Sequence, residues 1–392
     1  MQKKLLTVAV ASALSAPAAV LAQTEVYGTI NMSLGMVKYT SGTAATTTSV
    51  SKWDVASHAS NYGVRSRENL GGGLTAWGQI ESNAPMERSA NVAITPASRN
   101  SAVGLQGGFG NFFIGQWTTP WSDLDSLWSV GTVGGWGPVT SIIGRRETTG
   151  QAPNPGCVNT VPTPATNVTP ICDAVESAGG VGHPFWRRIS QGAFYQSPVM
   201  SGVQVKLAAQ APEGKATLTA ANPWMWSTSV QWAGMGGRAR VGAAYDNHKD
   251  FTTIGKADTG YRVTGGFNFG VVDLGLAYEA MSYKSAASGD IKAKQYGAAL
   301  AVPIGGNFVR VSYAVAKDMD SRAGSGAKTY NAGYEHRFSK RTQAGVGYAK
   351  IDNKSAAAFA WTGLPPNGNG FTNGPGAGSD VSTFFINMVH RF

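Results

Sequence analysis

The chain has 392 residues, of which 51 are glycine and 10% are aromatic, whereas only 14% carry a charge, and its formal net charge is +10. This balance is unusual for a soluble enzyme. Beyond residue 22 no run of ~18 apolar residues occurs, which excludes membrane-spanning helices. The scattered Lys and Arg residues form no clustered stripe, which argues against a nucleic-acid-binding protein.

The chain begins with a segment typical of a secretory signal peptide. Two lysines precede an apolar stretch in residues 1–22, and the segment ends in the letters VLA, with small residues where a signal peptidase cleaves. The apolar part is too short for a transmembrane anchor. We therefore predict cleavage before Gln23, export, and one mature domain of residues 23–392.

Period-two alternation of apolar and polar residues dominates the rest of the chain. In "VVDLGLAYEA", for example, Leu274, Leu276 and Tyr278 fall on one parity, whereas Asp273 and Glu279 fall on the other. Such segments run for about 10 to 14 residues, longer than ordinary soluble strands and suited to a tilted crossing of a bilayer. We predict sixteen strands, at 24–38, 57–70, 73–86, 98–107, 110–117, 187–198, 201–210, 222–233, 236–248, 258–270, 271–284, 292–303, 305–317, 327–338, 341–352 and 379–392.

The connections between these strands alternate in length. Short Gly- or Pro-containing turns such as "LGGGL" and "PIGGN" alternate with long connections, among them 39–56, 118–186 and 353–378. Such alternation of short and long connections is not expected in a soluble β-sandwich. The pattern predicts an all-β fold, a closed antiparallel transmembrane barrel of about sixteen strands with short periplasmic turns and long extracellular loops.

Several stretches resemble the trimeric, sixteen-stranded general porins of Gram-negative outer membranes, of the beta-proteobacterial type. They are "VYGTIN", "NYGVRSRENLGGGLTAWGQIES", "RNSAVGLQGGFGNFFIGQ", "FYQSPVMSGVQV" and the terminal "VHRF". The resemblance implies passive diffusion of ions and small hydrophilic solutes, with no cofactor and no catalysis. It also implies a homotrimer and a long third loop, here 118–186, folded into or over the lumen, where loop acids face a ladder of basic wall residues.

The basic ladder that the resemblance implies consists of Arg65, Arg67, Arg99 and Arg188. Strand parity places Arg65 and Arg67 toward the lumen. Arg99 shares its parity with apolar neighbours, so a bulge or a rim position is open, and ordinary solvated charge remains the alternative. Asn61 and Gln116 stand where family members usually carry arginine, which predicts a weakened charge discrimination that still favours anions.

The acidic candidates are Asp123 and Asp125 in "WSDLDSLW", at the beginning of the long loop. They could equally hydrogen-bond the loop backbone. The loop also contains tryptophans, which form either a stacking surface for a permeant or packing contacts against the barrel, and packing is favoured. They are Trp117, Trp121, Trp128 and Trp136.

Two cysteines, Cys157 and Cys172, lie in the same loop. Export to an oxidising compartment predicts a disulfide between them. A metal site is not expected, because His183 is the only histidine nearby and neither CxxC nor HxxxH spacing occurs.

The chain ends on Phe392, which would be a poorly protected end in a soluble protein. In a barrel the last strand pairs with the first and removes the free edge, and the resemblance implies that a terminal Phe is read by the barrel-assembly machinery. Outer-membrane lipid and lipopolysaccharide are the other expected partners. Two alternatives to a general porin stay open: a substrate-specific channel with an aromatic and amide-lined constriction, and a plugged structural barrel. An enzyme is not favoured, since no GxSxG elbow or paired carboxylates occur.

Overall fold

The computed structural model describes residues 23–40, 49–86, 96–137, 142–143, 185–211, 222–251, 255–285, 289–320, 323–357, 359–361 and 378–392. Nearly all of these residues lie in one antiparallel sheet. Its strands are β1 (Gln23–Thr40), β2 (Ser49–Ser57), β3 (Asn61–Gly71), β4 (Leu74–Asn83), β5 (Ser101–Gly107), β6 (Gly110–Thr118), β7 (Arg188–Gln196), β8 (Val203–Gln210), β9 (Trp224–Gly234), β10 (Ala239–Lys249), β11 (Ala257–Asn268), β12 (Asp273–Ser285), β13 (Gly289–Ile304), β14 (Asn307–Ala316), β15 (Ala327–Arg337), β16 (Thr342–Asn353) and β17 (Asp380–Arg391).

The sheet closes on itself. Apart from β2 and β3, which both pair with β1, each strand pairs with its sequence neighbour, and β17 pairs with both β16 and β1. At the closing point the backbones of Gly28 and Phe392 exchange two hydrogen bonds of 3.1 Å. The result is a sixteen-stranded barrel, as predicted, because β2 and β3 act as one strand. Closure leaves no unpaired edge to face the bilayer.

The β2–β3 pair corrects the predicted strand pattern. Residues Ser49–Ser57 form strand β2, although the sequence interpretation placed them in the loop 39–56. β2 pairs with the C-terminal half of β1, and β3 pairs with its N-terminal half. Between them Ala59 adopts a φ of 53°, and the Ser60 hydroxyl bonds the Asn31 backbone in place of the interrupted ladder. The left-handed conformation of Ala59 interrupts the two-residue alternation of side chains, so the sequence pattern did not reveal β2 as a continuation of β3.

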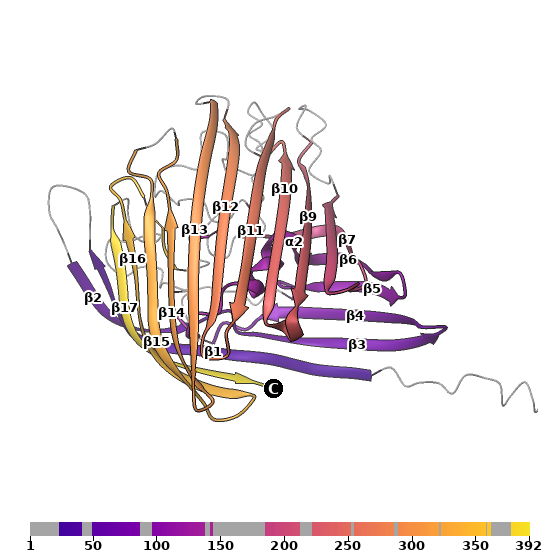
Figure 1. The fold of residues 1–392 in the computed structure, drawn as a ribbon, viewed down its shortest axis with the longest axis horizontal. Helices are drawn as coiled ribbons and strands as arrows, with labels where there is room; N and C mark the ends of the chain where they lie inside the picture. Colours follow the sequence, from indigo (N-terminus) through magenta and orange to yellow (C-terminus); the bar gives the residue numbers. More distant parts are fainter. Residues whose placement is uncertain are drawn as a thin grey trace, which may run out of the picture.

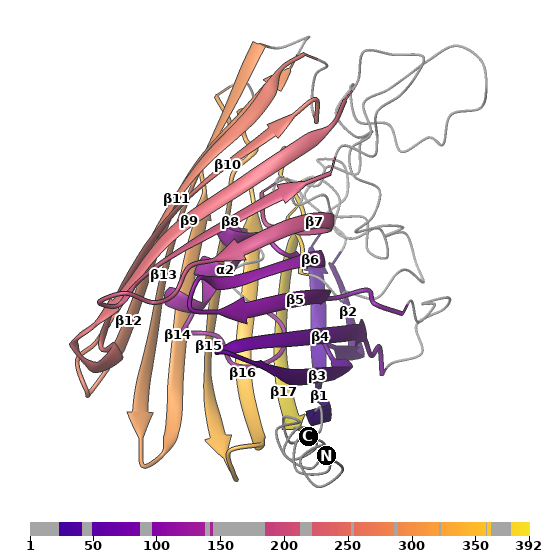
Figure 2. The same cartoon turned by 90° about the vertical axis from the view of Figure 1, so that its right-hand side faces the viewer.

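The two walls of the barrel cross at a large angle. In Figure 1, β3, β4 and β5 run across the view, while β9 to β16 stand upright. Figure 2 shows β3 to β7 stacked across the foreground with β12 to β17 behind them. A tilt of roughly 40° on every strand produces this crossing on opposite walls.

Strand parity separates a lumen face from a lipid face. On β12, Glu279, Met281 and Tyr283 are buried, whereas Leu276 is 53% exposed and Tyr278 is 37% exposed. The same rule holds on the neighbouring strands. Exposed apolar side chains therefore point outward to lipid, and polar or small residues point inward.

The connections follow the predicted asymmetry. At one rim the turns are tight, as between β13 and β14, where Gly305 and Gly306 adopt φ values of 56° and 88° that suit a two-residue hairpin turn. The strand ends that lead into the long connections lie at the other rim. Among the described residues no helix is long and apolar enough to cross a membrane.

Two short helical turns follow β6: α2 (Pro120–Asp123) and η1 (Leu124–Leu127). A further turn, η4 (Met235–Gly237), joins β9 to β10. Thr119 caps α2 by accepting a hydrogen bond from the Ser122 N–H at 3.3 Å, and Pro120 occupies the first helical position. The chain thus bends inward directly after β6, and the main buried apolar clusters lie between this segment and the wall.

Candidate functional site

Residues 119–137, named here the inner loop, lie against the inside of the barrel wall. The inner loop passes first over β10 and β11 and then over β14 and β15, because the side chains that hold its carbonyls come from these strands. These hydrogen bonds run from Arg262 to the Trp121 carbonyl at 2.8 Å, from Arg240 to Leu127 at 2.6 Å, from Arg310 to Val130, and from Asn331 to Trp136 at 3.1 Å. For residues 119–137, the predicted folding of the third loop into the lumen is thus confirmed.

Glycines on the lumen face of the wall make room for the inner loop. A Cβ on Gly275 would lie 1.8 Å from the Trp128 carbonyl oxygen, and one on Gly297 would lie 2.5 Å from the Trp128 ring. On β1, next to β17, a Cβ on Gly35 would lie 2.6 Å from the Trp136 ring. Any larger residue would push the loop into the lumen, so these glycines set how closely the loop follows the wall.

The loop tryptophans divide into two kinds. Trp121, Trp128 and Trp136 are 0% exposed, so they pack the loop against the wall, which is the favoured interpretation from the sequence. Trp117 is only half-buried and contacts Trp77 of β4, with ring centroids 5.8 Å apart.

Both acidic candidates of the loop are bonded to wall cations. Asp123 accepts a hydrogen bond from Thr118 at 3.0 Å and pairs with Lys206 of β8 at 2.9 Å. Asp125 pairs with the buried Arg262 and accepts further bonds from Trp128 and Trp186. The inner loop contains no other carboxylate. Its negative charge is therefore compensated by one cation of β8 and one of β11.

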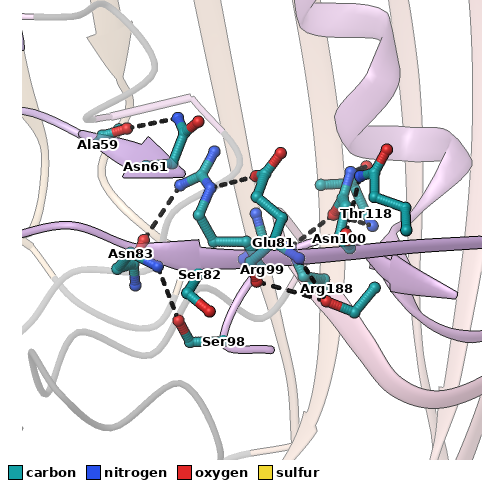
Figure 3. Close-up of polar contacts among 12 residues, drawn as sticks. Ala59, Asn61, Glu81, Ser82, Asn83, Ser98, Arg99, Asn100, Thr118 and Arg188 are labelled. Carbon is teal, nitrogen blue, oxygen red and sulfur yellow. Dashed lines mark hydrogen bonds and ion pairs between the residues drawn. The ribbon is translucent and has the colours of Figure 1, made fainter. Parts of the chain in front are cut away.

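Arg65 and Arg99 lie on the opposite wall, and each pairs with a carboxylate. Arg65 and Glu25 are 2.8 Å apart and half-exposed, whereas Arg99 and Glu81 are 2.5 Å apart and mostly buried. Glu81 also accepts a bond from the Tyr27 hydroxyl at 2.9 Å. Arg99 precedes β5 instead of lying in it, and its own N–H bonds the Glu81 carbonyl at 3.0 Å. Figure 3 shows Arg99 reaching Glu81 and Asn83.

Arg67 and Arg188 have different surroundings. Arg67 is exposed on β3 and makes no salt bridge among the residues that the structure describes. Arg188, at the start of β7, donates from Nε to the Asn100 side chain at 2.7 Å, and Asn100 also bonds Thr118 (Figure 3). The structure thereby brings Arg99 and Arg188 to adjacent positions on one wall, linked through residues 99 and 100.

Asn61 and Gln116, which stand where an arginine was expected, donate hydrogen bonds to backbone carbonyls. Asn61 donates to the Ala59 carbonyl at 3.0 Å, beside the left-handed residue that separates β2 from β3 (Figure 3). Gln116 donates to the carbonyls of Ala97 and Arg99 at 3.1 and 3.0 Å. Both side chains stabilise the ends of strands on the basic wall, which the sequence did not predict.

Comparisons with known proteins agree with this geometry. The sequence profile described as Gram-negative porin matches residues 6–356. The chain belongs to the Gram-negative porin family. It forms an outer-membrane channel for passive diffusion of ions and small hydrophilic solutes.

This porin is 25% identical to outer membrane porin protein 32 of Delftia acidovorans over 401 residues that cover both chains completely. Among solved structures it is similar to an anion-selective porin from Comamonas acidovorans, with 22% identity, a TM-score of 0.71, and coverage of 95% of this chain and all of the other. It is also similar to OmpF of Salmonella typhi, with 13% identity, a TM-score of 0.54, and coverage of 94% and 97%. The similarity to these two solved structures shows that the fold is shared.

Several residues of the porin lumen escaped the sequence analysis. Arg262 and Lys206 hold the loop carboxylates, and Glu25 and Glu81 compensate the wall arginines. Strand parity was the signal that could have placed each of them on an inward face, but partners up to 137 residues apart in the chain come together only through barrel closure and the loop path.

An aromatic cluster on the lumen face was also missed. Trp77 contacts Trp117 and Phe113, and Phe113 stacks on Phe194 with an interplanar angle of 4°. Trp77 donates its indole N–H to Asn111 at 2.8 Å. Trp77 and Trp117 are only half-buried, so they offer ring surface on the same wall that carries Arg99 and Arg188.

A cavity of about 390 Å³ lies at the short-turn end of the lumen, beneath Val130 of the inner loop. Phe308 lies between Arg310 and Arg337, whose guanidinium carbons are 4.7 and 4.2 Å from its ring centroid. Both arginines pair with the single carboxylate of Glu335, at 3.0 and 2.8 Å. This end of the lumen therefore carries an excess of positive charge.

Two other predictions fall on residues outside the described ranges: the signal peptide 1–22, and the pair Cys157 and Cys172. The ring of Phe392 is 47% exposed beside Gly28 at the short-turn rim, where a Cβ on Gly28 would lie 2.4 Å from it.

Proposed function

We propose that this porin conducts anions in preference to cations, with weak discrimination. The observation that carries this proposal is that both inner-loop carboxylates, Asp123 and Asp125, are bonded to wall cations. The transverse field across the lumen then comes mainly from the opposite wall. Because Arg310 and Arg337 share one carboxylate, positive charge exceeds negative charge at the periplasmic end. The similar Comamonas protein is described as an anion-selective porin, which supports the same preference.

The basic wall supplies the remaining selectivity in this proposal. Arg65, Arg67, Arg99 and Arg188 line the pathway as the basic ladder, and Glu25 and Glu81 reduce its charge. Asn61 and Gln116 contribute neutral amides where an arginine would add a cation.

The reversal potential across a potassium chloride gradient tests the ion preference. We expect a modest displacement toward the chloride equilibrium potential in planar bilayers. A strong cation preference would contradict the proposal. Large, steady single-channel steps would separate an open channel from a plugged structural barrel.

A second candidate is a channel with a preferred solute that contains a ring. The half-buried Trp77 and Trp117, beside Arg99 and Arg188, offer stacking surface next to hydrogen-bond donors. Saturation of solute flux in liposomes, lost in Trp77→Ala, would support this candidate. Flux that scales with solute size alone would exclude it.

The partners and processing of the chain complete the proposal. We infer cleavage of residues 1–22, a disulfide between Cys157 and Cys172, no enzymatic activity, and insertion through the barrel-assembly machinery by way of Phe392. A homotrimer is inferred from the family resemblance and from the similar OmpT of Vibrio cholerae, one structure of which is described as a trimer form. Outer-membrane lipid and lipopolysaccharide are the proposed surroundings.

A further inference from the structure

Lysines lie on the outer face of the barrel at the long-loop ends of its strands. On β13 the alternation is unambiguous, since Ile291, Ala293 and Gln295 are buried and Lys292 and Lys294 are exposed. The same parity turns the lysines of the neighbouring strands outward. Together they are Lys38 on β1, Lys249 on β10, Lys284 on β12, Lys292 and Lys294 on β13, Lys317 after β14, Lys328 on β15 and Lys350 on β16.

Four of these residues are close neighbours and are named here the lysine cluster: Lys292, Lys294, Lys317 and Lys328. The N–H of Lys317 bonds the Lys294 carbonyl at 2.9 Å, so these two residues are adjacent across β13 and β14. Lys328 is paired with Val315, two residues before Lys317. Alternate residues of a strand lie ~7 Å apart and neighbouring strands ~4.8 Å apart, so one phosphorylated group can reach several of these ammonium groups.

Two acidic residues lie beside the lysine cluster, because Asp352 is the cross-strand partner of Lys328 and Asp290 stands two residues before Lys292 on the same face. Each of them forms its salt bridge with a lysine outside the cluster, so the four lysines keep an excess of positive charge. Lys284 pairs with Asp290 and Lys350 with Asp352, and Asp380 lies 3.7 Å from Lys350. Asp320 approaches the cluster through its backbone N–H, which bonds the Lys292 carbonyl at 3.2 Å. Among the described residues no carboxylate forms a salt bridge with any of the four lysines.

The lysine cluster lies directly beyond a band of outward aromatic residues. Tyr278 pairs with Tyr296, and Tyr313 with Tyr330, at matching positions on adjacent strands. Lys294 stands two residues beyond Tyr296, and Lys328 two residues beyond Tyr330. Aromatic bands mark the boundary between hydrocarbon and headgroups in membrane barrels. The ammonium groups therefore lie at the depth of the headgroups of the outer leaflet.

The opposite wall lacks this feature. On the outward faces of β3 to β8 the described residues include no lysine, and the exposed side chains are mainly apolar, such as Val64, Ile80, Val103 and Ile114. Outward lysines are therefore confined to one part of the circumference, running from β10 to β17 and β1.

We propose that the lysine cluster binds the phosphate groups of the anionic glycolipid of the outer leaflet, and that the wall β12–β16 faces this lipid. Ammonium groups bind phosphate as compact point charges, and attraction of basic groups to an anionic membrane surface acts within a Debye length of it. The tyrosine band fixes the depth, and the lysines supply the charge. The proposal rests on the outer-membrane location and on the proposed lipid partner, and it is independent of conduction.

The test measures binding of purified lipopolysaccharide to the full-length protein in detergent. The variant combines Lys292→Gln, Lys294→Gln, Lys317→Gln and Lys328→Gln, and its probes are native lipopolysaccharide and the same preparation after dephosphorylation. We expect about tenfold weaker binding of the native lipid by the variant, and equally weak binding of the dephosphorylated lipid by variant and parent.

A matched pair of double variants controls for loss of charge. Lys292→Gln with Lys294→Gln removes two outward cations near the long loops, whereas Lys340→Gln with Arg341→Gln removes two exposed cations at the periplasmic rim. Only the first pair should weaken binding. Equal effects of the two pairs, or full binding after dephosphorylation, would overturn the proposal. Single-channel conductance should stay unchanged in all variants, so a failure of the proposed ion preference would not affect this result.

Discussion

The wall from β9 to β17 and the wall from β3 to β8 are built differently on both faces. On the lumen side the first carries small residues under the inner loop, such as Gly275, Gly297 and Ala299, while the second carries long charged side chains such as Arg65 and Glu81. Outside, the first wall carries the lysines and the second is mainly apolar. Small inward residues thus make room for the loop, arginines such as Arg262 between them hold its backbone, and the opposite wall keeps exposed charged side chains such as Arg65.

Removing the cation that joins loop and wall should produce the largest effect. Arg262 is fully buried and pairs with Asp125 of the loop and, at 2.9 Å, with Glu279 of β12. Arg262→Met would leave two carboxylates without their partner, which costs ~3–5 kcal/mol for a buried pair. We expect loss of heat resistance of the folded barrel on gel electrophoresis, and a shift of the reversal potential toward cations.

The control for this change is Arg341→Met, which removes an exposed arginine from the periplasmic turn after β15. It should leave both measurements unchanged. Equal stability of the two variants would mean that the loop is held in place by packing alone.

Replacing a lumen-face glycine that contacts the inner loop should produce an intermediate effect. In Gly275→Val the new side chain would meet the backbone of Trp128, which cannot rotate away. Overpacking of this kind costs ~1–3 kcal/mol. We expect a displaced loop, seen as a lower melting temperature and a changed unit conductance. The control is Gly78→Val on the lipid face of β4, because Gly78 shares the parity of the exposed Ile80 and its Cβ would have its nearest neighbour at 4.0 Å. Both variants behaving alike would mean that the close approach of Trp128 to Gly275 does not hold the loop in place.

The smallest effect is expected for the exposed salt bridge between Glu25 and Arg65, on the side of the barrel that the inner loop does not cover. Glu25→Gln would release Arg65, with a stability change below ~1 kcal/mol, because both side chains are about half-exposed. The anion preference in reversal-potential measurements should rise slightly, since one lumen carboxylate disappears. Glu68→Gln, an exposed change at the end of β3 near the periplasmic turn, is the control. A decrease in anion preference would show that Arg65 does not face the permeating ions.

Much of the fold was predictable because alternation is a local property. The predicted strands agree with the observed ones to within a few residues, including the last, predicted at 379–392 and observed at Asp380–Arg391. The strand Ser49–Ser57 was missed, although Trp53 and Val55 alternate with Lys52 and Asp54, because the irregular residues near Ala59 separate it from β3. The charge partners were not predictable, as Asp125 and Arg262 illustrate.

Local patterning was enough to specify the closed barrel, its short and long rims, and the family, since period-two alternation and turn residues act over a few neighbouring positions. Which charges in the lumen compensate one another depended on the three-dimensional path of the chain. The inner loop runs across the wall in an order that follows from closure, and electrostatic pairing depends on distances of a few ångströms between residues far apart in the chain. The four lysines of the outer cluster likewise become neighbours only when three strands pair.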